Sequence, residues 1–179
     1  SCADELEGLL AAEHVGTALI REVGARTTEK FRVLARNQQL IRLDFDHQPG
    51  ERALDDLQQK FQDLLGSTDV LVLSDYGKGA LTRVHDLIEA ARAAGKPVVV
   101  DPKGNDFDRY RGATIITPNW NEFVAVVGDC DSEQQFHICA QELRESLELK
   151  MLLVTRGDKG MSLFREGNVA SDLPAKATE

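Results

Sequence analysis

The sequence lacks the features that mark several large classes of protein. No apolar stretch approaches the ~18 residues of a membrane span, and no signal peptide is visible. The net charge is −9, without the basic surplus that nucleic-acid-binding proteins use. The three cysteines, Cys2, Cys130 and Cys139, show no C-x-x-C spacing, which gives no support to a zinc site and is typical of reduced thiols in a cytoplasmic protein. We therefore expect no nucleic acid and no membrane as partner.

Two common nucleotide motifs are also missing. There is no G-x-x-x-x-G-K-[ST] segment, which excludes a P-loop NTPase, and no G-x-G-x-x-G after a strand, which removes the main support for a dinucleotide oxidoreductase. Histidine does not point to a metal site either, because the four histidines are scattered without ligand spacing: His14, His47, His85 and His137.

What the sequence does contain predicts an α/β fold. With 42% hydrophobic residues in 179, the chain can bury the core of one domain. Apolar residues recur at helical spacing over 3–12, 52–65, 81–94 and 133–147, with Gly95 as a helix-ending residue. Short apolar runs over 70–73, 97–100, 114–117 and 151–154, with a further one at 161–165, predict strands. This alternation is typical of a parallel sheet with helices on both faces.

A different pattern precedes this region. Apolar and polar residues alternate over 31–35 and again over 40–45, with a break at 37–39. The pattern predicts two half-exposed strands, whose edge could pair with a second copy of the chain.

Four polar, glycine-bearing clusters follow consecutive predicted strands. They are SDYGKG (74–79), DPKG (101–104), TPNWNE (117–122) and TRGDKG (155–160). In a parallel sheet the carboxyl ends of the strands share one edge, where ligands bind. The four clusters together therefore predict the rim of an active site.

Each cluster also has an ordinary structural interpretation. Asp75 could end a strand or cap a helix, and Asp101 and Lys103 could pair on the surface. Gly157 and Gly160 could form a turn, or their backbone N–H groups could face a phosphate.

The cluster at 117–122 and the loop before it leave further alternatives. Asn119 and Glu122 could form a capping box at a helix start, which is itself a place for phosphates. Trp120 would usually belong to a core, but its position between Asn119 and Glu122 puts it on the rim. Arg109 and Arg111 are most simply interpreted as part of a solvated loop.

Two of these segments resemble the ribokinase-like (PfkB-type) carbohydrate kinases. TPNWNEF (117–123) is similar to their T-P-N-x-x-E element, and VTRGDKG (154–160) to their T-x-G-x-x-G nucleotide loop. Within that family, RVLARNQQLIRLDFD (32–46), LSDYGKGAL (73–81) and DPKGNDFDRYRGAT (101–114) resemble the kinase domains of bacterial heptose-phosphate kinase/adenylyltransferases. The resemblance runs from about residue 29 to 163, and more faintly through the first helix.

The resemblance implies a doubly wound, mainly parallel α/β kinase core over about 52–179, with a small β lid over about 30–46. It implies ATP and Mg²⁺ as cofactors. The reaction would be phosphoryl transfer to the anomeric hydroxyl of D-glycero-β-D-manno-heptose 7-phosphate, in ADP-heptose synthesis for the lipopolysaccharide core.

The same resemblance assigns roles to individual residues. Asn119 and Glu122 would sit at the magnesium–ATP phosphates, with Glu122 acting on the metal through water. The other nucleotide-binding candidates are Trp120, Asn121, Thr155, Gly157, Gly160 and Lys103. Lys103 would face the phosphate region, and so would Asp101. The substrate-binding candidates are Lys30, Arg32, Arg42 and Asp75.

Two family elements are not found in the sequence. There is no G-A-G-D, the element that carries the catalytic base, and the early glycine-pair sugar-binding segment is absent. We therefore expect the middle part of a kinase domain, with the base beyond Glu179 and no turnover by this chain alone. A homodimer through the lid strands is also expected. The alternatives are another PfkB-type sugar kinase, or a non-catalytic α/β module that binds a nucleotide or mediates oligomer contacts.

Overall fold

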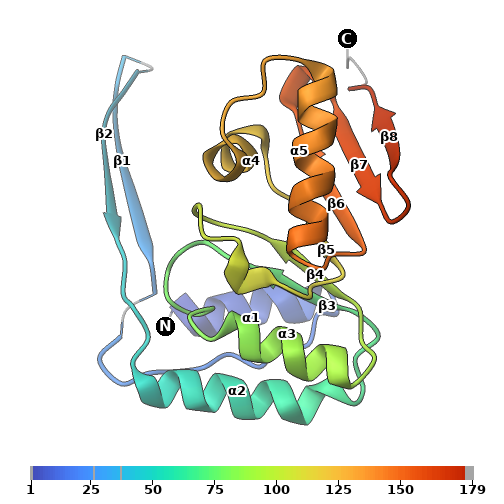
Figure 1. The fold of residues 1–179 in the computed structure, drawn as a ribbon. Coiled ribbons are helices and arrows are strands. Elements are labelled where there is room, and N and C mark those ends of the chain that lie inside the picture. The colour runs from blue at the N-terminus through green and yellow to red at the C-terminus, as the bar shows by residue number, and fades with distance from the viewer. Residues whose placement is uncertain (1, 26, 37, 176–179) are drawn as a thin grey trace. The chain divides into compact units, whose positions relative to one another are not determined.

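A computed structural model describes residues 2–25, 27–36 and 38–175 of the chain (Figure 1). Asn37, at the predicted break between the two lid strands, lies outside the described residues. The chain divides into two compact units. Unit 1 comprises Ser1–Asp63 with Lys78–Ala80, and unit 2 comprises Leu64–Gly77 with Leu81–Glu179.

Unit 1 contains helix α1 (Cys2–Ala12), strands β1 (Glu29–Ala35) and β2 (Gln38–Phe45), and most of helix α2 (Glu51–Leu65). The two strands form an antiparallel ribbon in which Phe31 lies opposite Leu43 and Val33 opposite Ile41. Because side chains alternate along a strand, these four share one face. Lys30, paired with Asp44, and Arg32, paired with Arg42, share the other.

The ribbon is more exposed than the sequence predicted. We expected half-exposed strands, but every residue of β1 and β2 is exposed, on the apolar face as well as the polar one. Phe31 is 55% exposed although its ring contacts that of Phe45 edge-on, at 5.9 Å between centroids. The reason is that a two-stranded ribbon has no second layer of its own to cover its apolar face.

Unit 2 contains a six-stranded sheet in the order β3-β4-β5-β6-β7-β8. Strands β3 (Leu71–Ser74), β4 (Val98–Asp101), β5 (Ile115–Ile116) and β6 (Met151–Thr155) are parallel. Strands β7 (Met161–Arg165) and β8 (Val169–Leu173) continue the sheet antiparallel. The predicted class, a mainly parallel α/β sheet with flanking helices, is confirmed. Strand β8 was not predicted, because its sequence VASDL has little of the apolar pattern of a strand.

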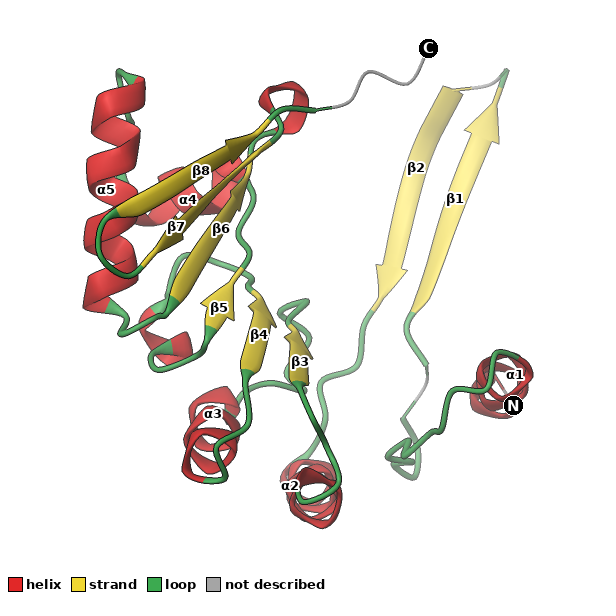
Figure 2. Cartoon of the chain, turned by 90° about the vertical axis from the view of Figure 1, so that its right-hand side faces the viewer, coloured by secondary structure: helices red, strands yellow, loops and turns green. Residues whose placement is uncertain are grey.

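Helices α3 (Val84–Ala93), α4 (Trp120–Val127) and α5 (Glu133–Ser146) pack against this sheet (Figure 2). Helix α3 ends as predicted, with Gly95 at φ +68°. The N–H of Gly95 donates to Arg92 O at 3.0 Å, and that of Lys96 to Ala91 O at 2.9 Å. These bonds satisfy carbonyls that the helix end leaves open. The helix begins three residues later than predicted, because Leu81 to Arg83 form a turn.

The core lies between this sheet and its helices. One cross-strand row is at most 6% exposed from β3 to β7, and consists of Leu73, Val100, Ile116, Leu152 and Phe164. Phe136 from α5 packs edge-on against Phe164, with ring centroids 5.2 Å apart. Each such apolar side chain gains roughly 1.5–3 kcal/mol on burial, so this row anchors the strands that carry the polar edge. Among the described helices, none is long and apolar enough to cross a membrane.

The loop between β6 and β7 requires glycine at its end. Gly160 has φ +83°, and a Cβ there would lie 2.0 Å from Leu173 O. We predict that Gly160→Ala lowers the free energy of unfolding by about 1–3 kcal/mol, from backbone strain and displacement of the β8 end. Urea denaturation measures the change. Gly66→Ala is the matched control, because its Cβ would meet nothing within 4 Å. Equal stability of the two variants would contradict the prediction.

Candidate functional site

The four polar clusters that follow β3 to β6 lie along one edge of the sheet. Ser74 and Asp101 are paired at the ends of β3 and β4. Asn119, beyond β5, forms an isolated parallel bridge with Thr155, the last residue of β6. The N–H of Thr155 donates to Pro118 O at 3.0 Å, which joins the last two clusters through their backbones. The parallel pairing thus brings together residues that are far apart in the sequence.

Helix α4 begins at this edge with a capping box. Asn119 Oδ1 accepts from the N–H of Glu122 at 3.0 Å, and Glu122 Oε2 accepts from the N–H of Asn119 at 3.1 Å. The capping interpretation of N-x-x-E is therefore confirmed. It does not compete with phosphate binding, because an α-helix start carries a partial positive charge and unpaired N–H groups.

Lys103 joins the β4 loop to this helix start. Its Nζ lies 2.8 Å from Glu122 Oε1, while Glu122 Oε2 holds the Asn119 N–H. The hydrogen bond and charge of Glu122 raise the pKa of Lys103. Lys103 thus pairs with Glu122 and not with Asp101, which was the alternative that the sequence left open. Asp101 Oδ2 accepts from Ser74 Oγ at 3.5 Å instead.

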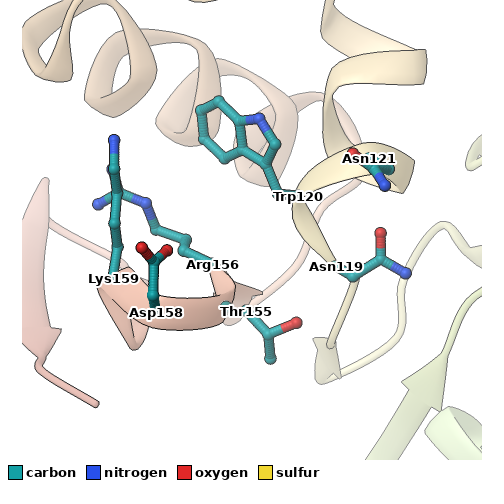
Figure 3. A pocket seen from close by; sticks show the side chains of 8 residues that line it. Asn119, Trp120, Asn121, Thr155, Arg156, Asp158 and Lys159 are labelled. Carbon is teal, nitrogen blue, oxygen red and sulfur yellow. The ribbon is translucent and has the colours of Figure 1, made fainter.

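Two cavities open along this edge and share Asn119 and Thr155 in their walls. The smaller, of about 360 Å³, is lined by Asp75, Tyr76, Asp101, Pro102, Lys103, Thr117 and Glu122 in addition. The larger, of about 580 Å³, is lined by Trp120, Asn121, Arg156, Gly157, Asp158 and Lys159 in addition (Figure 3). All these residues belong to unit 2. The two cavities therefore meet at the Asn119–Thr155 bridge.

Asp75 is a buried carboxylate beneath the smaller cavity. Its side chain is 4% exposed, Oδ1 accepts from the N–H of Gly77 at 2.7 Å, and Oδ2 accepts from the hydroxyl of Tyr110 at 2.8 Å. The Tyr110 oxygen in turn accepts from the N–H of Lys103 at 3.1 Å. Tyr110 thus braces the β3 and β4 loops against each other.

Arg109 is not the solvated residue that the sequence predicted. Its guanidinium donates to Leu81 O at 2.5 Å, lies 3.7 Å from Asp75 Oδ2, and stands 5.5 Å from the centre of the Tyr110 ring. The prediction was wrong because residues 108–110 form a 3₁₀ turn that puts Tyr110 into the core and draws Arg109 along with it. Arg111 pairs with Asp108 at 2.5 Å.

All but one of the predicted nucleotide residues line a cavity. The larger cavity is lined by Asn119, Trp120, Asn121, Thr155 and Gly157, and the smaller one by Lys103 and Glu122. Gly160 is outside that lining, and its N–H donates to Gly157 O at 3.0 Å. It shapes the loop, whereas Gly157, at φ +62° with nothing within 4 Å of an added Cβ, borders open space.

Three residues of the larger cavity were not among the predicted site residues: Arg156, Asp158 and Lys159. Their positions inside T-x-G-x-x-G were the available signal. The pattern names only the threonine and the glycines, and so it gave no role to the side chains between them.

The predicted substrate residues Lys30, Arg32 and Arg42 share the polar face of the ribbon in unit 1. Arg42 Nε and Nη2 each lie 2.9 Å from an oxygen of Asp44. The bond raises the pKa of Arg42 and lowers that of Asp44. Arg32 lies directly opposite Arg42, a like-charge cross-strand pair whose repulsion is reduced by the bond between Arg42 and Asp44.

A metal held by protein ligands alone does not fit this edge. No group of three or more His, Cys, Asp or Glu side chains suited to a metal occurs among the residues that the structure describes. A magnesium ion that keeps its waters and is held mainly by substrate phosphates does fit, because it needs only one or two carboxylates. Glu122 can serve such an ion through water, since both its oxygens already hold protein donors.

The titration of Tyr110 tests the hydrogen bonds that link Asp75, Tyr110 and Lys103. Burial raises the pKa of Tyr110 to about 12, and the neighbouring Asp75 adds to the shift. The pKa of an unfolded tyrosine is about 10. The protonated phenol therefore contributes its full stability to the folded state below about pH 10, and this contribution is lost as the pH rises toward about 12.

We predict that phenolate absorbance in a Tyr76→Phe background reports a midpoint near pH 12 for Tyr110. Tyr110→Phe should cost about 1.5–3 kcal/mol at neutral pH, the usual value of a hydrogen bond to a charged group. A midpoint near pH 10 with an intact circular dichroism spectrum would refute the buried network.

Comparisons with known proteins identify relatives of this chain. The chain is 50% identical over 177 residues to the "Bifunctional protein HldE" of Chromohalobacter salexigens. The match covers 99% of this chain and 37% of that protein. The namesake from Aeromonas hydrophila is 49% identical over 177 residues, with the same two coverages. The chain thus spans little more than a third of the length of these curated relatives.

Solved structures agree on the fold. Escherichia coli phosphofructokinase-2 in complex with fructose-6-phosphate superposes with a TM-score of 0.76 at 22% identity, over 98% of this chain and 60% of that one. Giardia lamblia ribokinase superposes with a TM-score of 0.74 at 17% identity, over 100% of this chain and 58% of that one. The sequence profile of the "pfkB family carbohydrate kinase" group matches residues 1–178. The chain therefore belongs to the pfkB family of carbohydrate kinases.

Proposed function

We propose that this chain carries the nucleotide site and part of the acceptor site of an ATP- and Mg²⁺-dependent sugar-phosphate kinase. The acceptor would be the anomeric hydroxyl of D-glycero-β-D-manno-heptose 7-phosphate, and the product would feed ADP-heptose synthesis for the lipopolysaccharide core. The observation that carries this proposal is the meeting of two cavities at the Asn119–Thr155 bridge. One cavity can hold the phosphate donor and the other the sugar acceptor. The phosphoryl group would then be transferred at the point where the two cavities meet. Roughly 50% identity to HldE proteins favours heptose over other sugars.

The phosphates are proposed to lie at the bridge. The start of α4, the backbone at Gly157 and the ammonium of Lys103 all supply positive charge or donors there. Phosphoryl transfer depends mainly on positioning and on neutralising charge, and bound Mg²⁺ would supply further neutralisation. Lys103 can leave Glu122 for a phosphate oxygen, because it is 54% exposed and its partner is held in the capping box.

The acceptor is proposed to bind in the smaller cavity of unit 2. Asp101 is exposed at that cavity, and the buried Asp75 holds the loop of Gly77 in shape. In unit 1, the polar face of the ribbon is proposed as a separate surface for a sugar phosphate, with Arg32 beside Arg42, which Asp44 already holds. Lys30 lies on the same face, opposite Asp44.

The general base is not assigned to any described residue. Because no G-A-G-D element occurs in the 179 residues, we expect this chain to bind nucleotide without transferring phosphate to heptose 7-phosphate.

The free thiols of Cys2, Cys130 and Cys139 suit the cytoplasmic location that the sequence predicted.

A pair of helix caps separates ligand binding from folding. Asn119 caps α4 at the cavity, and Ser132 caps α5 by accepting from the Gln135 N–H at 3.1 Å. Replacing either by alanine should cost about 1 kcal/mol of stability. We predict that Asn119→Ala weakens Mg²⁺–ATP binding by about tenfold, an energy of ~1.4 kcal/mol, whereas Ser132→Ala leaves it unchanged.

Isothermal titration of the 179-residue chain, with and without Mg²⁺, measures both effects. The proposal requires binding that strengthens with Mg²⁺. Absence of magnesium-dependent nucleotide binding would instead identify a non-catalytic module. Equal losses in the two cap variants would show that Asn119 acts through helix stability alone.

We further propose that the apolar face of the ribbon pairs with a second copy. That face carries Phe31, Val33, Ile41, Leu43 and Phe45, each 49–58% exposed. A ribbon of two strands is marginally stable in water by itself, so a covering layer is expected. A twofold partner supplies the same apolar face in return.

Reversal of polarity on one face of the ribbon tests this dimer. We predict that Ile41→Glu converts a dimer of the 179-residue chain into a monomer, because it buries a carboxylate in the apolar interface. Arg32→Glu, on the opposite face of the same ribbon, should leave the dimer intact. Sedimentation equilibrium reports the mass. A monomeric wild-type chain would contradict the proposal.

A further inference from the structure

Arg156 occupies an unusual place in the wall of the larger cavity. It is the second residue of the T-x-G-x-x-G loop, yet its side chain is only 8% exposed. Its backbone N–H donates to Gly160 O at 2.7 Å, which closes the loop, and its Nη1 lies 3.3 Å from Ser162 Oγ on β7. Burying a guanidinium this deeply is costly unless its surroundings hold it tightly.

The charge of Arg156 is already matched by protein. Its Nη2 lies 2.5 Å from Glu133 Oε1 at the start of α5, and this bond is the main reason why the pKa of Glu133 is lowered. Lys159 Nζ stands 3.8 Å from the same carboxylate oxygen and is 67% exposed. Lys159 is therefore free to move toward an anion, whereas Arg156 is fixed and neutralised.

Two aromatic rings hold the flat guanidinium. Its central carbon lies 4.5 Å from the centre of the Phe136 ring and 5.5 Å from that of Trp120. The two rings are themselves 5.3 Å apart. Phe136 is 1% exposed, so it is a rigid support, and the half-buried indole of Trp120 borders the cavity. Cation–aromatic contacts of this kind are strongest when they are shielded from water.

We propose that Arg156 is a positioning residue that holds the Trp120 indole as a stacking wall for the nucleobase. This inference rests on the proposed nucleotide site. The phosphates belong at the other end of the cavity, because Asn119 borders Lys103 and the α4 start there. The Trp120 indole and the Arg156 side chain lie away from the Asn119 side chain, and Lys159 stands beside Arg156 (Figure 3). The flat indole rests on a guanidinium whose charge Glu133 already matches, and such a surface suits an aromatic heterocycle better than a phosphate.

The chain provides a direct optical readout of this arrangement, because Trp120 is its only tryptophan. Arg156→Lys keeps the charge but loses the planar fork that stacks on rings. We expect the variant to show increased acrylamide quenching of Trp120 fluorescence. Arg165→Lys is the matched control, since Arg165 is an exposed arginine of β7 that bonds Ser171 Oγ at 2.9 Å and does not line the cavity.

Binding of two probes separates a base-side role from a phosphate-side role. We expect Arg156→Lys to weaken Mg²⁺–ATP binding by about tenfold while leaving binding of Mg²⁺–tripolyphosphate unchanged. An equal loss for both probes would identify a phosphate ligand and overturn the proposal. Unchanged quenching and unchanged affinity for ATP would overturn it as well.

Other outcomes are also decisive. If the wild-type chain binds neither probe, both the nucleotide function and the nucleobase site are contradicted. The quenching comparison then still tests whether Arg156 orders the indole. If Arg156→Lys does not fold, Trp120→Phe takes its place. It keeps an aromatic ring but reduces the stacking surface, and it must weaken ATP binding while sparing tripolyphosphate. Equal losses, or none, would overturn the proposal.

Discussion

Strands β3 to β6 run parallel, and their carboxyl ends therefore reach the same edge of the sheet. The buried row from Leu73 to Phe164 holds these strands in register, so the polar groups beyond them cannot move independently. The proposed nucleotide site depends on this constraint. Lys103 reaches Glu122, and Asn119 meets Thr155, only because strands separated in sequence are neighbours in the sheet.

The site residues also contribute to the stability of the fold. Asn119 and Glu122 close the start of α4, Tyr110 ties the β3 loop to the β4 loop through Asp75 and Lys103, and Arg156 joins α5 to β7. Such bonds keep donors and charges in place before a ligand arrives. Preorganisation of this kind is what phosphoryl transfer requires, because most of its catalysis comes from positioning and electrostatics.

Sequence reasoning predicted the parts of the molecule that follow from local patterns. The apolar runs predicted β3, β4, β6 and β7, the position of Gly95 predicted the end of α3, and the N-x-x-E spacing fitted the capping box. The features it missed depend on contacts distant in sequence. Arg109 is drawn inward by Tyr110 and Asp75, and Arg156 is buried by Phe136 and Glu133 of helix α5. Strand β8 exists because β7 offers it an edge, although its own sequence is largely polar.

The central claim is that the edge around Asn119 and Thr155 holds the donor nucleotide of a sugar kinase. A crystal structure of the chain with Mg²⁺ and a non-hydrolysable ATP analogue tests it most directly. The account predicts the terminal phosphate within hydrogen-bond distance of Asn119 or Lys103, a water between the metal and Glu122, and the base against Trp120. A nucleotide bound elsewhere on the chain, or one with its base at Lys103 and its phosphates at Trp120, would contradict the account.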